Sequence, residues 1–435
     1  MKQLHKLKKG SYLIATILLL LIGNIMNAQA QQASFDKDRL IKIDEVINRH
    51  IAAKHIPGAT ALVISKGQVV YNKAFGYADL ATKRKMQTDD IFRIASQSKA
   101  ITSLAVMTLW EEGKFLLDEP VSKYIPAFKH PRVLVNYHPK DGSYTTRPAS
   151  REITIRDLLR HTSGIAYPAI FSDPTMWSIY EKAGVPSGIG TTKSTVKEKM
   201  ELLATMPLQH DPGERFTYGL NTDLLGYLVQ IWSGQSLDVF LKTRVFDPLE
   251  MNDTWFHIPD EKQNRLVSLY ENTADGRLIK VEHPIYEGIE PGFPNLKGSY
   301  LSGGAGLSST AADMAKFYSL YLNEGVYNGK RIIGRKTIEL MLTNQLGSEV
   351  TTSPFPAQPE NFQFSLGGFA VVTEKNDYLS PESVGSFGWG GAFNTHGWAD
   401  PTEGIIAILF TQEYLSPWFS IGEEFQVAVY QAIKN

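Results

Sequence analysis

The sequence has no cysteine among its 435 residues, which excludes disulfide bonds, thiol catalysis and cysteine-based metal sites. It has no excess of one charge either, since 44 basic side chains face 45 acidic ones, and without a basic tract nucleic-acid binding is not indicated. No Gly-x-Ser-x-Gly pattern occurs, so the serine turn of α/β-hydrolases is not supported. The chain is otherwise ordinary in composition and long enough for one large domain or two.

Long apolar runs are absent after the amino terminus. Within the first 30 residues, a lysine-rich end, the apolar run 12–22 and the small-residue sequence Ala28-Gln29-Ala30 follow one another. This order is typical of a secretory signal peptide, and the apolar run is shorter than the ~20 residues of a spanning helix. We therefore expect a signal peptide at 1–30 and an exported domain at 31–435, periplasmic or secreted, with no membrane span.

A serine and a lysine three residues apart stand at the front of the stretch 91–126. Ser96 and Lys99 precede an apolar run without glycine or proline until Gly113, which predicts a helix packed on most of its faces. Residues three apart share a helix face, so the two side chains should point the same way. Burial and the positive end of the helix dipole would both disfavour a charged lysine and make its amine a better proton acceptor.

The stretch FRIASQSKAITSLAVMTLWEEGKFLLDEPVSKYIP resembles the active-site segment of the serine β-lactamase and penicillin-binding-protein superfamily. The likeness is greatest to the branch of class C β-lactamases and related esterases. It implies an α/β (α+β) fold of the β-lactamase type, with an antiparallel sheet flanked by helices, a mostly helical lobe and the site between them. It also implies Ser96 as nucleophile and Lys99 as base, with no metal and no organic cofactor.

A second segment of this resemblance contains Tyr218, which is expected to relay protons in the related enzymes' manner. The alternative is a core tyrosine with a satisfied hydroxyl. The family's Tyr-x-Asn form is not kept, because Leu220 occupies the amide position and Asn221 comes one residue late. Asp223, five residues after Tyr218, fits the esterase version Tyr-Ser-x-x-x-Asp better. Asn221 and Asp223 are both candidates for substrate binding.

In β-lactamases the third element is Lys-Thr-Gly or His-x-Gly on a strand beside the serine. Trp389-Gly390-Gly391-Ala392 resembles instead the Trp-Gly-Gly of the superfamily's esterases. The glycines let the backbone approach a substrate, and the N–H of Ala392 is expected to join that of Ser96 as the oxyanion hole. Trp389 offers no cation to a substrate carboxylate, which favours neutral esters over β-lactams. The nearby His396 is interpreted as a pocket residue or a structural one.

Hydrophobic periodicity and turn residues predict the remaining elements. They are helices over 36–54, 224–232, 311–323 and 421–433, a hairpin over 59–75, and strands over 369–373, 395–399 and 405–411. The segments 129–151 and 345–364 are expected to be surface excursions.

Three further motifs have structural interpretations. The glycine-rich sequence 303–313 lacks a P-loop lysine, so we expect a tight turn before a helix capped by Thr310. His161 and Ser163 are expected in a turn held by hydroxyl groups, not in a catalytic dyad. The aromatic residues of 165–206 either line a substrate site or pack in the core.

We therefore expect an exported serine hydrolase that cleaves small carboxylic esters through an acyl-enzyme on Ser96. One alternative is a β-lactamase or D-amino-acid peptidase acting on cell-wall peptides. Another is a non-catalytic wall-binding protein, although such a protein has no need of the serine, lysine and tyrosine together. The substrate is thus a small ester or wall-derived molecule, and the oligomeric state stays open.

Overall fold

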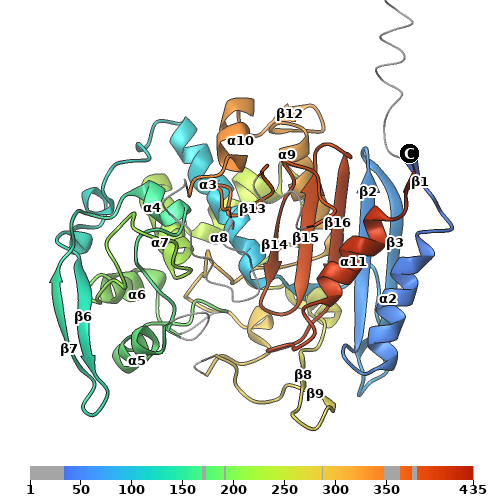
Figure 1. Cartoon of the computed structure of the whole chain (residues 1–435), viewed down its shortest axis with the longest axis horizontal. Helices are drawn as coiled ribbons and strands as arrows, with labels where there is room; N and C mark the ends of the chain where they lie inside the picture. Colours follow the sequence, from blue (N-terminus) through green and yellow to red (C-terminus); the bar gives the residue numbers. More distant parts are fainter. Residues whose placement is uncertain are drawn as a thin grey trace, which may run out of the picture.

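The computed structural model describes residues 34–168, 173–190, 193–286, 288–346, 363–374 and 380–434. Within these residues, a seven-stranded antiparallel sheet forms one side of the molecule and a mostly helical lobe the other (Figure 1). The strand order is β13-β14-β15-β16-β2-β3-β4, so strands from the two ends of the chain pair directly. The bounds are β2 Gly58–Ser65, β3 Gln68–Asp79, β4 Arg84–Lys85, β13 Ala370–Val371, β14 Phe387–Gly391, β15 Thr395–Asp400 and β16 Ile405–Phe410.

The centre of the sheet follows from its sequence. Strand β16 reads IIAILF and is buried throughout, as expected of a strand covered on both faces. It pairs with β15 on one side and with β2 on the other. The β2–β3 hairpin turns at Lys66 and Gly67, which both have positive φ. The predicted hairpin and carboxy-terminal strands are confirmed.

Helices cover the two faces of the sheet. On one face lie α2 (Ile41–Ala52) and α11 (Ile421–Tyr430), over the alternate residues Ala61, Ala407 and Leu409 (Figure 1). On the other face lies α9 (Ala311–Leu322), which packs on β16 and β2. As predicted, the Thr310 side chain caps α9, accepting from the Asp313 N–H at 3.1 Å.

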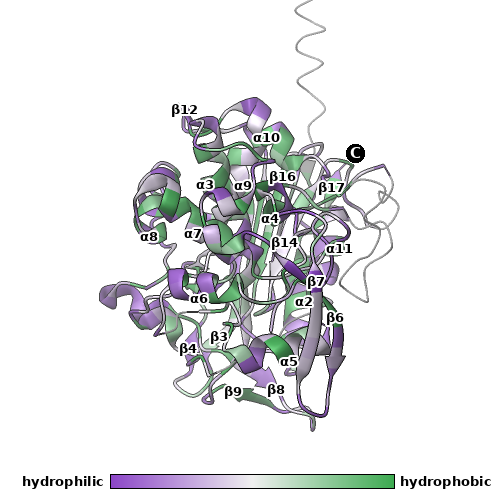
Figure 2. Ribbon diagram, turned by 90° about the vertical axis from the view of Figure 1, so that its left-hand side faces the viewer, coloured by the Kyte–Doolittle hydropathy of each residue, from purple (hydrophilic) through white to green (hydrophobic). Residues whose placement is uncertain are grey.

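The helical lobe is built around α3 (Ser98–Glu111) and α7 (Asn221–Ser233), which pack against each other. Helix α3 is followed by Gly113 at φ +71°, the predicted stop. In Figure 2 these helices carry mixed colours, while the hairpin of residues 132–148 is mostly pale to purple. The other helices are α4 Ile155–Leu159, α5 Pro174–Ala183, α6 Val196–Leu203, α8 Leu237–Leu241 and α10 Arg335–Leu342, with a π-helical turn at Lys242–Phe246.

Smaller elements complete the described chain. They are the strand pairs β1 Ser34–Phe35 with β17 Ile433–Lys434, β5 Phe92–Arg93 with β10 Ser308–Ser309, β6 Arg132–His138 with β7 Ser143–Pro148, β8 Tyr270–Asn272 with β9 Leu278–Lys280, and β11 Val326–Tyr327 with β12 Lys330–Arg331. None of the helices in the described ranges is long and apolar enough to cross a membrane.

The segment 129–151 lies at the surface as expected, but it forms the β6–β7 hairpin, whose strand pairing was not predicted. Its residues are mostly polar and exposed, so the apolar alternation that usually marks a strand is missing. Most of the second expected excursion, 347–362, lies outside the described residues, as do the first 33 residues with the expected signal peptide.

Candidate active site

Ser96 lies in a short 3-10 turn, Ala95–Gln97, that leads directly into α3. The residue before it, Ala95, has φ +41°, which is unusual for a side chain other than glycine. Such local strain is common at functional sites, where the surrounding structure imposes it. The strained turn places Ser96 at the front of the helix, one turn ahead of Lys99.

Lys99 is 1% exposed, and its amine contacts neutral groups. The Nζ atom lies 3.2 Å from Ser96 Oγ and donates to the Gly304 carbonyl at 2.9 Å. It also faces the rings of Tyr218 and Tyr167, at 4.6 and 5.6 Å from their centroids. The predicted serine–lysine contact is present, and the carbonyl and rings fix the amine beside the hydroxyl.

Tyr218 lies just before α7 and is 3% exposed. Its hydroxyl accepts a hydrogen bond from Trp389 Nε1 at 3.2 Å. Trp389 belongs to β14, so this contact joins the helical lobe to the sheet. Together with the Lys99–Tyr218 contact, it brings the three predicted sequence motifs into one site.

The end of β14 approaches the serine turn closely. A Cβ atom on Gly391 would lie 2.4 Å from the Ile94 carbonyl oxygen, so no other residue fits there without displacing the strand. Ala392 opens the turn after β14 and packs in the same apolar cluster as Ala95. Gly390 has more space, because its nearest contact from a Cβ would be 3.3 Å. The oxyanion role of the Ser96 and Ala392 amides stays a prediction.

Asn221 is directed at the 161–164 turn. It is fully buried, and its amide bonds to His161 Nδ1 at 2.9 Å while its oxygen accepts from Ser163. Ser163 Oγ also accepts from the Ile165 N–H at 3.0 Å, which confirms the predicted turn held by hydroxyl groups. Burial and the nearby Lys99 charge lower the pKa of His161 well below its ordinary value. Asn221 therefore fixes the start of α7, next to Tyr218.

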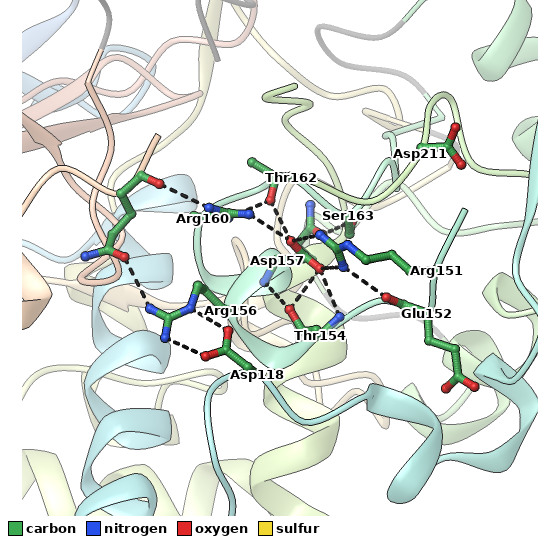
Figure 3. Close-up of polar contacts among 12 residues, drawn as sticks. Asp118, Arg151, Glu152, Thr154, Arg156, Asp157, Arg160, Thr162, Ser163 and Asp211 are labelled. Carbon is green, nitrogen blue, oxygen red and sulfur yellow. Dashed lines mark hydrogen bonds and ion pairs between the residues drawn. The ribbon is translucent and has the colours of Figure 1, made fainter. Parts of the chain in front are cut away.

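The same turn is anchored by a buried carboxylate, Asp157 (Figure 3). Arg151 binds it through two nitrogens at 2.5 and 3.0 Å, and Arg160 adds a third contact at 3.2 Å. The Thr154 and Thr162 hydroxyls donate to it at 2.8 and 3.0 Å. Burial acts to raise the pKa of Asp157, but these donors hold it below its ordinary value. The Asp157 cluster, defined by these five residues, thus supports the 161–164 turn.

Asp223 lies near Lys99, again fully buried. It accepts from the Tyr300 hydroxyl at 3.1 Å, and a Cβ on Gly304 would come within 2.7 Å of its Oδ2 atom. Burial raises the pKa of Asp223 to about 6, although the Lys99 charge and the Tyr300 hydroxyl act in the opposite direction. Asp223 therefore lies behind the lysine, with the Gly304 backbone packed against it.

His396 lies on the other face of the sheet from Ser96. On β15 it alternates with Gly397, whose carbonyl accepts from Tyr318 of α9, and it packs instead against Gly422 of α11. Its Nε2 donates to Asn394 Oδ1 at 2.7 Å, and burial lowers its pKa to about 4. Of the two interpretations of His396, the structure favours the structural one.

Sequence reasoning missed several residues of the site. Gly303 and Gly304 were interpreted only as a turn, yet a Cβ on Gly303 would lie 2.7 Å from the Thr222 carbonyl oxygen, and the Gly304 carbonyl binds Lys99. The two adjacent glycines were the sequence feature that could have indicated this close backbone approach. Tyr300 carried none, because nothing marks a single tyrosine 77 residues from Asp223. Of the aromatic residues in 165–206, Tyr167 lies at the site, whereas Tyr180 is a core residue that donates to the Pro207 carbonyl.

Comparison with known proteins agrees with this geometry. The sequence profile of the Beta-lactamase family matches residues 43–429. The chain belongs to this family of serine hydrolases. Its fold is accordingly the β-lactamase/transpeptidase-like fold, and the esterase branch suggested by Trp-Gly-Gly has named relatives.

The relatives carry several activities in their names. Esterase EstB of Burkholderia gladioli is 28% identical over 85% of this chain and 89% of its own length. An N-acetylmuramyl-L-alanine amidase of Bacillus subtilis is 28% identical over 91% and 86%. The solved structure of EstCE1, a hydrolase with promiscuous acyltransferase activity, superposes with a TM-score of 0.76 at 27% identity, covering 91% of this chain and 99% of that one.

Proposed function

We propose that this chain is a carboxylesterase that cleaves small esters through an acyl-enzyme on Ser96. The Ser96 Oγ–H proton passes to Lys99 Nζ, 3.2 Å away, as the oxygen bonds to the ester carbonyl carbon. The C–O bond to the alcohol then breaks, and the alkoxide takes a proton through the Tyr218 hydroxyl. Water repeats the sequence on the acyl-enzyme, which releases the carboxylic acid and restores Ser96.

The Trp389–Tyr218 hydrogen bond carries the choice of esters. A β-lactam or D-Ala-D-Ala peptide has a carboxylate that must lose water on binding, and a charged partner would contribute about 1.5–3 kcal/mol. Trp389 presents an apolar ring and an N–H that is already directed at Tyr218. Such a wall suits an uncharged acyl or alkoxy group. Esterase EstB and EstCE1 support this proposal by name.

Action on cell-wall peptides is the second candidate. It is favoured by relatives named as an amidase in Bacillus subtilis and a putative D-alanyl-D-alanine carboxypeptidase in Escherichia coli. Export, inferred from the amino-terminal residues, would place either activity outside the cytoplasm. A non-catalytic wall-binding protein would leave the buried Lys99–Ser96 contact without a purpose.

One comparison of substrates tests the proposal. We expect kcat/KM for short p-nitrophenyl esters to exceed that for a chromogenic cephalosporin by about 10²-fold, or ~2.7 kcal/mol, in the purified wild type. A fluorophosphonate should label Ser96, as located by peptide mass spectrometry, and Ser96→Ala should remove both labelling and turnover. Trp389→Lys should reduce the ratio of kcat/KM for the esters to that for the cephalosporin, mainly through weaker ester turnover. Cephalosporin turnover equal to that of the esters would reverse the assignment.

A further inference from the structure

The turn that carries Ala392 is held from behind by the segment that follows β16. Strands β15 and β16 pair up to Thr395 and Phe410, which places residues 411–413 beside the turn 392–394. The backbone N–H of Thr411 donates to the Asn394 carbonyl at 3.3 Å, and that of Glu413 donates to the Phe393 carbonyl at 3.2 Å. These two hydrogen bonds join the segment after β16 to the turn that contains Ala392, whose N–H is the expected oxyanion donor.

Side chains complete this contact in a buried network. Asn394 has φ +62°, and its Nδ2 donates to Glu413 Oε2 at 2.8 Å. The Thr411 hydroxyl lies 2.8 Å from the Asn394 carbonyl and 2.5 Å from the same Glu413 oxygen. Asn394, Thr411 and Glu413 are all fully buried, so hydrogen bonds within the protein must satisfy their polar groups.

The distances in this network favour a proton on Glu413. Thr411 has one hydroxyl proton, yet two oxygens that only accept, a carbonyl and an ionised carboxylate, would compete for it. A neutral carboxylic acid removes the conflict, because its O–H donates to Thr411 Oγ1 while the Thr411 hydroxyl donates to the Asn394 carbonyl. The carboxyl oxygen still accepts from Asn394 Nδ2.

We propose that Glu413, held as a neutral carboxylic acid, is a positioning residue that fixes the Ala392 turn through Thr411 and Asn394. This inference rests on the proposed esterase function, because the turn is relevant to catalysis only if the Ala392 amide binds the oxyanion. A donor of an oxyanion hole acts only in the correct position. Loosening the turn therefore affects the transition state more than substrate binding.

The electrostatic surroundings agree with a neutral Glu413. Burial raises its pKa to about 8, against the opposing effect of Thr411 and Asn394. The elements packed against it present His396 behind Asn394, Arg93 bonded to the Gln412 side chain, and Tyr270 paired beside it. His396 is neutral, since its pKa is about 4, and the Arg93 guanidinium is bound to Gln412 and to backbone carbonyls.

Four variants test the proposal, with p-nitrophenyl acetate turnover measured from pH 6 to 9.5. Glu413→Ala and Asn394→Ala should each lower kcat by about 10²-fold at pH 7 with KM changed less than threefold, the scale of a lost oxyanion donor. Glu413→Gln should recover part of that loss, because its amide nitrogen donates to Thr411 as the acid does but cannot accept from Asn394 Nδ2. It should also retain activity above pH 8, where the wild-type acid ionises. Glu382→Gln, at a half-buried carboxyl elsewhere whose pKa burial also raises, is the control and should behave as wild type.

Thermal unfolding gives a readout that does not depend on the esterase assignment. The folded-state pKa of Glu413 lies above its unfolded value of 4.5, so wild-type stability should fall as pH rises from about 5 to 8 and then level off. Glu413→Gln has no titrating carboxyl at this position. The difference between its melting temperature and that of the wild type should therefore increase from pH 5 to about 8 and stay constant above pH 8.

The possible outcomes separate the two proposals. A wild type without esterase activity but with the expected melting behaviour refutes the esterase function and keeps the neutral Glu413. Loss of activity in Glu413→Gln equal to that in Glu413→Ala, or a melting gap that does not change between pH 5 and 8, would overturn the role of Glu413.

Discussion

The Asp157 carboxylate and the Lys99 amine are both buried, but their surroundings differ in charge. The Asp157 carboxylate receives two guanidinium groups and two threonine hydroxyls, so its charge is neutralised by direct contact (Figure 3). Lys99 contacts a hydroxyl, a carbonyl and two ring faces, all of which are neutral. The first arrangement holds a carboxylate ionised, and the second leaves the Lys99 amine without a carboxylate in contact.

This difference separates a structural site from a reactive one. Removing one partner of a buried ion pair is strongly destabilising, because the other charge is left buried and unpaired. A buried amine without a carboxylate in contact costs stability and is retained for its chemistry. The two sites are also connected, because the Asp157 cluster supports the 161–164 turn, which in turn binds Asn221 beside Tyr218.

Lys99→Met should have the largest effect of these variants, on activity and not on stability. Removing the base is expected to lower kcat for p-nitrophenyl acetate by about 10³–10⁴-fold. Methionine has a similar length without a charge, so the melting temperature should stay equal or rise. Steady-state kinetics and thermal unfolding measure the two effects, with Ser96→Ala as the reference for complete loss. A variant that loses both activity and several degrees of stability would show that Lys99 is a structural residue.

Asp157→Asn should have the second-largest effect, on stability and not on rate. It leaves two arginines beside a neutral amide, and breaking a buried pair from one side costs about 3–5 kcal/mol of unfolding free energy. Urea denaturation measures this loss, and kcat of the folded fraction should stay within a few-fold of wild type. A loss below about 1 kcal/mol would place this cluster among ordinary surface ion pairs.

The pH dependence of unfolding provides the control for Asp157. Its pKa in the folded protein is below the ordinary 3.8, so its contribution is present above pH 4 and is lost as pH falls through the folded pKa. The stability difference between wild type and Asp157→Asn should therefore shrink below pH 4. A difference that stays constant down to pH 2 would contradict the assignment of an ionised Asp157.

The sequence predicted the fold, and the contact between Ser96 and Lys99, because both depend on local patterns. The alternating or continuous apolar runs of β2 and β16, and the helix after Ser96, are visible without a structure. What it could not predict depends on contacts between distant segments. The Gly304 carbonyl on Lys99 and the Tyr300 hydroxyl on Asp223 cross 205 and 77 residues of chain. The face occupied by His396 depends on the register of β15, which a single residue does not reveal.

Tyr218→Phe should have an intermediate effect on the reactive side. The variant keeps the ring beside Lys99 but removes the hydroxyl that accepts from Trp389, so only the proton relay and one hydrogen bond are lost. We expect kcat to fall by about 10²-fold, or ~2.7 kcal/mol, with little change in melting temperature. Single-turnover kinetics should show slower acylation. Full activity in Tyr218→Phe would mean that Tyr218 is a packing residue and that Lys99 works without it.

Asp118→Asn should have the smallest effect of these variants. It compares an exposed ion pair with the buried pair of Asp157 and Arg151. Asp118 pairs with Arg156 through two hydrogen bonds of 2.7 and 2.9 Å, a geometry as good as that of Asp157 with Arg151. Its side chain is 71% exposed, however, whereas that of Asp157 is 1% exposed. Water and salt screen an exposed pair, so its removal should cost about 0.2–1 kcal/mol, and less at high ionic strength. Urea denaturation of both variants at 0.05 and 0.5 M salt would measure the contrast. If Asp118→Asn and Asp157→Asn cost the same, then neither burial nor the additional hydrogen bonds of Asp157 strengthen its ion pair.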